Sequence, residues 1–167
     1  LRIEEGAHVD VLDSLIGDNE AVLGGGAYVF GPFARLFLSA GTILGSVGTP
    51  SLSPNRAVDL FPASAQGGGI WCGGGGSVYI ENARIRANTS EGDGGGLYAD
   101  RCGVSIRPTS GFVGNADGFV TFFENTAGGN GGGLYLANQS SVNWASLPAN
   151  YCAGRATGNR AIGRGGA

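Results

Sequence analysis

Apolar and polar residues alternate along this chain only over short stretches. Runs such as 76–80, 103–106 and 119–123 are rich in β-branched and aromatic residues and are bounded by glycine, asparagine or aspartate. This is the pattern of short β-strands separated by turns. The i, i+3, i+4, i+7 spacing of an amphipathic helix does not persist outside residues 33–44. The pattern therefore predicts an all-β chain.

The short strands belong to a degenerate repeat. An apolar residue, two variable residues, an asparagine, any residue and a small residue precede a glycine run, which a variable residue and an aromatic residue follow. A further run at 67–69 is followed by Trp71 but has no asparagine lead-in at the usual distance, so it is interpreted as lacking one. The residues of the structural repeat are Asn19, Gly24, Gly25, Gly26, Tyr28, Asn88, Gly94, Gly95, Gly96, Tyr98, Asn125, Gly131, Gly132, Gly133, Tyr135 and Asn159.

Self-similar units of this kind are typical of solenoids. In a parallel β-helix each strand pairs with its equivalent one coil later, about 4.8 Å away, so equivalent side chains form columns. Ile16, Ile85 and Phe122 are predicted to form an inward column. Another column is predicted for the aromatic residues Tyr28, Trp71, Tyr98 and Tyr135. The asparagines are expected at a corner, with their amides bonded from coil to coil. The predicted fold is a right-handed parallel β-helix with loop insertions.

The composition favours a scaffold role for the glycines and argues against some functions. Glycine supplies 34 of 167 residues, and each costs roughly 0.5–1 kcal/mol relative to alanine inside a strand. Many glycines must therefore stand where no other residue fits. With 42% hydrophobic residues the chain is not a disordered tract. A formal net charge of −3, with no lysine, predicts no nucleic-acid partner.

The order Phe/Ile-x-x-Asn-x-Ala followed by Gly-Gly-(Gly/Ala)-x-Tyr resembles the repeat of chlamydial polymorphic outer-membrane proteins and related autotransporter passengers. That group is similar to the pectin-lyase-like right-handed β-helix superfamily. The resemblance runs from Ile16 to Ala167 through short motifs, and it departs in its long inserts and lysine-free composition. It implies an extracellular or cell-surface segment with a structural or adhesive role. The alternative is a fragment of a polysaccharide lyase or glycoside hydrolase of that superfamily.

The organisation of the chain is predicted to be a single β-helical segment over 1–167, part of a longer extracellular protein. Loop excursions are predicted at about 45–66, 107–118 and 147–157. The expected partners are flanking β-helix coils or a copy of the chain end to end, and host or cell-surface glycans or proteins through the loops. Direct membrane insertion is not expected, because Pro32 and Arg35 interrupt the most apolar stretch.

Candidate chemistry is sparse, and the chain is predicted not to be an enzyme and to need no cofactor. Glycoside hydrolysis requires paired carboxylates, and Asp93 and Asp100, with Arg101, flank one glycine run without an acid repeated in the next copy. Residues 91–96 match a calcium-binding β-helix nonapeptide only loosely. His8 is the only histidine and no Cys-x-x-Cys occurs, so no metal site is predicted.

Cysteine and asparagine chemistry leave two open questions. Cys72 and Cys102 lie 30 residues apart, close to one coil, and either form a disulfide in an oxidising compartment or are buried small hydrophobic residues. Cys152 is the third cysteine. Of two N-glycosylation sequons, the one at Asn138 lies in a predicted loop, whereas Asn88 belongs to the asparagine column, so Asn138 is the candidate acceptor.

The column arrangement also makes two predictions about stability. Gly132→Val is expected to destabilise more than Gly128→Val, because only the former lies in the glycine run. Asn125→Ala is expected to cost on the order of 1–3 kcal/mol if its amide pairs with buried backbone groups.

Overall fold

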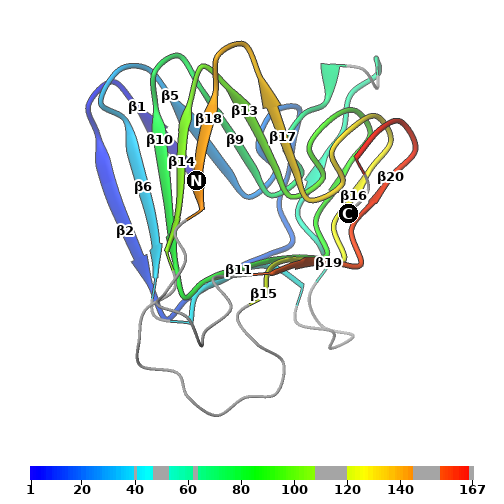
Figure 1. The fold of residues 1–167 in the computed structure, drawn as a ribbon, viewed down its shortest axis with the longest axis horizontal. Helices are drawn as coiled ribbons and strands as arrows, with labels where there is room; N and C mark the ends of the chain where they lie inside the picture. The colour runs from blue at the N-terminus through cyan, green and yellow to red at the C-terminus, as the bar shows by residue number, and fades with distance from the viewer. Residues whose placement is uncertain (40, 47–52, 62–63, 108–119, 145–154, 166–167) are drawn as a thin grey trace.

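The structure is a computed structural model that describes residues 1–39, 41–46, 53–61, 64–107, 120–144 and 155–165. The described residues form twenty strands in four parallel sheets of five strands each (Figure 1). This confirms the predicted all-β parallel β-helix.

Each coil of the helix contributes one strand to each sheet. Coil 1 contains β1 (Arg2–Glu4), β2 (His8–Leu12), β3 (Leu15–Ile16) and β4 (Glu20–Ala21). Coil 2 contains β5 (Ala27–Phe30), β6 (Arg35–Ser39), β7 (Ile43–Gly45) and β8 (Arg56–Ala57). Coil 3 contains β9 (Ile70–Gly73), β10 (Ser77–Glu81), β11 (Arg84–Arg86) and β12 (Thr89–Ser90). Coil 4 contains β13 (Leu97–Asp100), β14 (Gly103–Arg107), β15 (Val120–Phe123) and β16 (Thr126–Ala127). Coil 5 contains β17 (Leu134–Ala137), β18 (Ser141–Trp144), β19 (Arg155–Thr157) and β20 (Arg160–Ala161).

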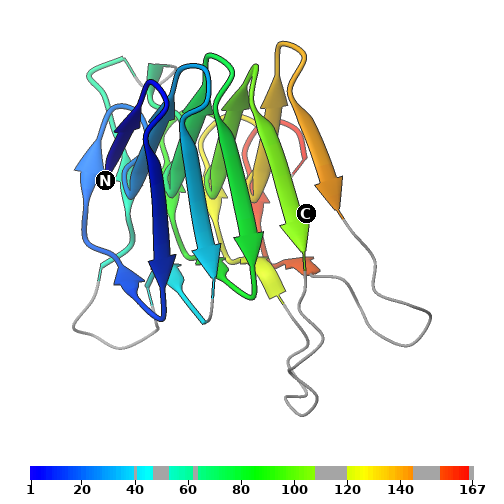
Figure 2. The same cartoon turned by 90° about the vertical axis from the view of Figure 1, so that its left-hand side faces the viewer.

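The four sheets are named here by their first strand. Sheet A has the order β1-β5-β9-β13-β17, and sheet B, sheet C and sheet D begin at β2, β3 and β4 in the same way. Every strand pair is parallel, and the chain advances by one coil each time it returns to sheet A. Figure 2 shows sheet B facing the viewer, with the chain descending there while the coils advance from left to right. This advance is that of a right-handed helix.

The core lies inside the coils and is built from stacked columns. In sheet C the inward column runs through Ile16, Leu44, Ile85 and Phe122, and the last three are fully buried. The structure thus places the three predicted residues in one column and adds Leu44 between them. In sheet D the inward column is Ala21, Ala57, Ser90, Ala127 and Ala161. These are the small residues of the repeat, and their size lets sheet D approach the glycine runs closely.

Insertions enter the helix at particular corners. Between sheets B and C, coil 3 needs only Asn82 and Ala83 to join β10 to β11, whereas coils 4 and 5 carry residues 108–119 and 145–154 there. These segments, and residues 47–52 of the first excursion, lie outside the described residues. Within the predicted excursion 45–66, β8 returns to pair with β4 and β12. Residues 155–157 of the third predicted excursion form β19.

Candidate functional site

The asparagines of the repeat form a continuous hydrogen-bonded column. Asn125 shows the pattern: its Nδ2 donates to Asn159 Oδ1 at 2.9 Å and to the backbone oxygen of Ile85 at 2.9 Å. Its Oδ1 accepts from both the backbone N and the Nδ2 of Asn88, each at 3.0 Å. All four bonding positions of this amide are therefore used, although Asn125 has no exposed surface.

This column also ties each coil to the backbone of the coil before it. The Nδ2 of every asparagine after the first donates to the carbonyl of the inward residue of sheet C one coil earlier. The predicted corner position therefore needs refinement. The amides of Asn55, Asn88, Asn125 and Asn159 lie in the interior, beside the turn between sheets C and D, where they pair buried backbone groups that water cannot reach, whereas Asn19 in coil 1 is exposed.

Asn55 is a member of the column that the sequence interpretation missed. It accepts from Asn19 Nδ2 at 2.8 Å and donates to Asn88 Oδ1 at 3.0 Å. The interpretation that the glycine run at 67–69 lacks an asparagine is therefore wrong. The insert after β8 lengthens the gap and hides the pairing. A usable signal was present, since Asn55-Arg56-Ala57 is identical to 159–161.

The glycine run is required by the same column. Gly131 has φ of 63°, in the left-handed region that favours glycine. A Cβ at Gly132 would collide with the backbone of Arg160, and one at Gly133 would lie 3.0 Å from the amide of Asn159. The first glycine thus adopts the left-handed turn conformation. The second leaves space for the backbone of sheet D, and the third leaves space for the asparagine side chain. Asparagine and glycine form one packing unit.

The aromatic residues of the repeat stack on the outer side of sheet A. Successive ring centroids along the column Tyr28, Trp71, Tyr98 and Tyr135 are 4.9, 6.4 and 5.4 Å apart. Their strand neighbours Val29, Cys72 and Ala99 point into the core instead. The Arg2 guanidinium lies 5.3 Å from the Tyr28 centroid and covers the first ring.

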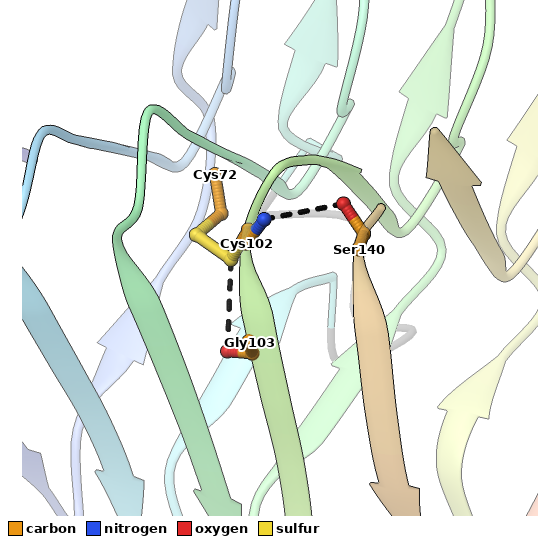
Figure 3. The surroundings of a disulfide bond; sticks show 4 residues. All are labelled: Cys72, Cys102, Gly103 and Ser140. Atoms are coloured by element: carbon orange, nitrogen blue, oxygen red, sulfur yellow. Dashed lines mark hydrogen bonds between the residues drawn. A yellow bond between two sulfur atoms is a disulfide. The ribbon is translucent and has the colours of Figure 1, made fainter. Parts of the chain in front are cut away.

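A disulfide joins Cys72 of coil 3 to Cys102 of coil 4, with the Cα atoms 5.8 Å apart (Figure 3). Both residues are buried. The backbone N–H of Cys102 also donates to Ser140 Oγ of coil 5 at 3.2 Å. Gly76 stands in the same column as Cys102, and its missing side chain leaves room beside the Cys72 sulfur. Cys152 lies outside the described residues.

The two candidate acids are occupied by contacts to the next coil. Asp93 Oδ1 accepts from the backbone N and Nδ2 of Asn130, at 2.6 and 3.0 Å. Asp100 Oδ1 accepts from Asn138 Nδ2 at 3.0 Å and lies 3.5 Å from Arg101. Burial, followed by the nearby Asp100 and Asp93, raises the pKa of Tyr98 above its usual value.

Two further site predictions fall in this region. Asn138 is exposed and has a left-handed φ of 41° at the turn after β17. A glycan would replace one of the two hydrogens on Asn138 Nδ2, the atom that donates to Asp100 Oδ1. Among the described residues, no group of three or more histidine, cysteine, aspartate or glutamate side chains is placed to hold a metal ion.

Comparison with known proteins gives one short match. A family model of the Chlamydia polymorphic membrane protein repeat matches residues 119–137. This range covers one copy of the repeat, from β15 through Asn125 and the run 131–133 to the end of β17. No curated protein and no solved structure gives a significant match. No helix in the described part of the chain is long and apolar enough to cross a membrane.

Proposed function

We propose that this chain is a structural β-helical segment of an extracellular, cell-surface protein, and that its inserted loops make adhesive contacts. The main support for the proposal is that residues 119–137 both match a family repeat and form the packing between coils. They match the Chlamydia polymorphic membrane protein repeat. The same copy places Asn125 and Gly132 in coil-to-coil packing. The repeat therefore encodes a scaffold.

The disulfide supports the extracellular part of the proposal. Disulfides persist in oxidising compartments and are rare in the cytosol. The Cys72–Cys102 bond is buried and joins two coils, so it is a structural bond rather than an exposed, exchangeable one.

Cell-surface location can be tested with antibodies raised against the purified chain. They should label intact source cells without permeabilisation, and protease treatment of intact cells should remove the label. Labelling that requires permeabilised cells would contradict the surface assignment.

The loops between sheets B and C are the proposed contact regions, because binding residues concentrate on loops held by a rigid scaffold. The short corner of coil 3 provides a template for removing these loops. Coil 3 closes this corner with Asn82 and Ala83 alone, so residues 108–120 can be replaced by Asn-Ala, and 146–154 likewise, with the register of coil 3 retained.

Beads coated with each loop-shortened variant are compared with beads coated with the parent chain for binding to host cells and to immobilised glycans. Loss of binding with an unchanged melting temperature would support adhesion through that loop. A Phe33→Ser variant is the control, because Phe33 is exposed in the short turn between β5 and β6, outside the inserts. Equal binding by all variants and the parent would contradict loop-mediated adhesion.

We also propose that the chain is not catalytic. The carboxylates that would serve a lyase or hydrolase, Asp93 and Asp100, bond amides of the next coil. Incubation with pectin, alginate and neutral glycans tests this. Specific cleavage that is lost in Asp93→Asn or Asp100→Asn would favour the polysaccharide-degrading alternative instead.

A further inference from the structure

We propose that the excursion of coil 2 between sheets D and A is a docking site for a cationic amphipathic peptide segment. Coil 3 joins its sheet D strand to its glycine run through residues 91–93, whereas coil 2 uses residues 58–66. The excursion projects beyond the neighbouring coils (Figure 1). The inference goes beyond the proposed function, because this corner is not the one that carries the loops between sheets B and C, and its failure would leave those loops untouched.

Two large apolar side chains stand next to each other on this excursion. Leu60 is 94% exposed and Phe61 is 73% exposed. Coil 2 pairs with coil 1 on one side and with coil 3 on the other, so this exposure does not arise from an open edge of the sheets. Burial of these two side chains against a partner would remove apolar surface from water and favour association.

Both ends of the excursion are fixed to the neighbouring coils. The backbone N–H of Val58 donates to the carbonyl of Ala21 at 3.0 Å, and that of Asp59 donates to Glu91 Oε2 at 3.2 Å. Where the chain returns, the backbone N–H of Gln66 donates to the carbonyl of coil 1 residue Val22 at 3.1 Å. The two apolar side chains are therefore presented from an anchored base, which reduces the conformational entropy lost on binding.

The charged side chains around this excursion are almost all acidic. On sheet D and the following corner of coils 1 to 3, Arg56 is the only base among the described residues, and Glu20 pairs with it at 3.4 Å. The acids of the same region are Glu20, Asp59, Glu91 and Asp93.

This combination of charge and apolar surface specifies one kind of partner. An apolar pair among carboxylates complements a helix with an apolar face bordered by lysine or arginine. It does not complement an anionic bilayer, whose charge the acids repel. A second copy offers no such segment, because the described part of the chain contains no helix and the sequence contains no lysine.

Isothermal titration calorimetry with an amphipathic helical peptide of leucine and lysine tests the proposal. The peptide should bind the 167-residue chain, and the same design with glutamate in place of lysine should not. The double variant Leu60→Ser, Phe61→Ser should weaken binding about tenfold, because both apolar contacts are lost. Phe33→Ser is the matched control, because Phe33 has the same 73% exposure but lies in the turn between β5 and β6.

A second pair of variants tests the acidic border without altering the apolar side chains. Asp59→Asn with Glu91→Gln should weaken binding about fivefold and make it less sensitive to salt, because two attractions to lysine are lost. Glutamine keeps an oxygen that can accept from the backbone N–H of residue 59. Asp10→Asn with Asp13→Asn removes two charges from sheet B and the turn after it, and should leave binding unchanged.

Each other outcome would overturn the proposal. No binding of the leucine–lysine peptide, or equal weakening by Phe33→Ser, would show that the excursion is not its site. Unchanged binding by Asp59→Asn with Glu91→Gln would remove the requirement for a cationic partner. Co-sedimentation with vesicles of phosphatidylcholine, with or without phosphatidylglycerol, that Leu60→Ser, Phe61→Ser abolishes would assign the excursion to a membrane. Self-association that this double variant abolishes would assign it to a second copy.

Discussion

The asparagine column inside the helix and the aromatic column outside it run through the same coils at the same spacing, yet they tolerate very different chemistry. Inside, five of five positions are asparagine, namely Asn19, Asn55, Asn88, Asn125 and Asn159. Outside, one tryptophan stands among three tyrosines, and Arg2 covers the end.

The difference follows from what each column must satisfy. An interior residue must donate two bonds and accept two in fixed directions, and an unpaired buried amide costs about 1–3 kcal/mol. Asparagine has the length and the groups to do so. The outer column mainly needs a flat face to cover its neighbour, with one hydrogen bond from Trp71 Nε1 to Gln66 Oε1 at 3.1 Å, and such ring pairs contribute about 0.5–1.5 kcal/mol beyond their buried area. Sequence identity is therefore strict inside and loose outside.

The largest expected effect comes from closing the space beside the inner column. Gly132→Val should destabilise the fold by roughly 4 kcal/mol, because its side chain meets the backbone of Arg160, which cannot move without breaking its own ladder. Gly103→Val is the control, since a Cβ there meets only Ser77 Oγ at 3.6 Å. Urea unfolding measures both changes, and equal midpoints would remove the packing argument.

Gly128 does not serve as the neutral control that the sequence suggested. A Cβ at Gly128 would collide with the backbone carbonyl of Glu91. The residue lies outside the glycine run, but it faces the same close approach between successive coils. Gly128→Val is therefore expected to destabilise too, and the contrast with Gly132 is not a test of the run.

Removing the disulfide tests whether the covalent bond stabilises coils 3 and 4 beyond the contribution of the asparagine and aromatic columns. The double variant Cys72→Ala, Cys102→Ala should lose about 3.6 kcal/mol, the value expected for a loop of this length. Alanine suits both positions, because Ala99 and Ala34 occupy the same columns. Reducing agent should lower the melting temperature of the parent chain and of Cys152→Ser but not of the double variant. Insensitivity of the parent would show that the bond contributes nothing.

Asn125→Ala tests the inner column directly. The variant should lose about 2 kcal/mol, because Asn88 loses the acceptor of two bonds and the Ile85 carbonyl loses its donor. Asn19→Ala in the exposed first coil should cost less than about 0.5 kcal/mol, since water can replace its contacts. Chemical denaturation of both variants gives the difference. Equal losses would mean that burial does not set the value of the amide.

The sequence predicted the columns better than it predicted the corners. Asn88, Asn125 and the glycine runs could be assigned because a fixed spacing of six positions repeats in three copies. Asn55 was missed because twelve positions, and not six, separate it from Gly67, although its partners lie in the adjacent coils. The outward direction of the aromatic column depends on strand phase, which short strands of two to five residues do not reveal. The spacing of Cys72 and Cys102 offered a disulfide between neighbouring coils, which the structure contains, but it left buried hydrophobic residues as the alternative because the bond depends on the diagonal approach of two columns.

The smallest expected effect lies on the outer column and appears only at alkaline pH. The pKa of Tyr98 is raised in the folded state by burial and by Asp100 and Asp93, so the folded state holds this proton more tightly than the unfolded chain does. Its contribution to stability is fully present below the unfolded pKa of about 10 and is lost as pH rises through the folded pKa. Tyr98→Phe keeps the ring stack without the phenol, so its free energy of unfolding should fall less steeply between about pH 9 and pH 11. If the free energies of unfolding of the two proteins fall in parallel with pH, deprotonation of Tyr98 does not destabilise the outer column. The outer column would then tolerate even a charged ring, and its contrast with the inner column would be larger than proposed.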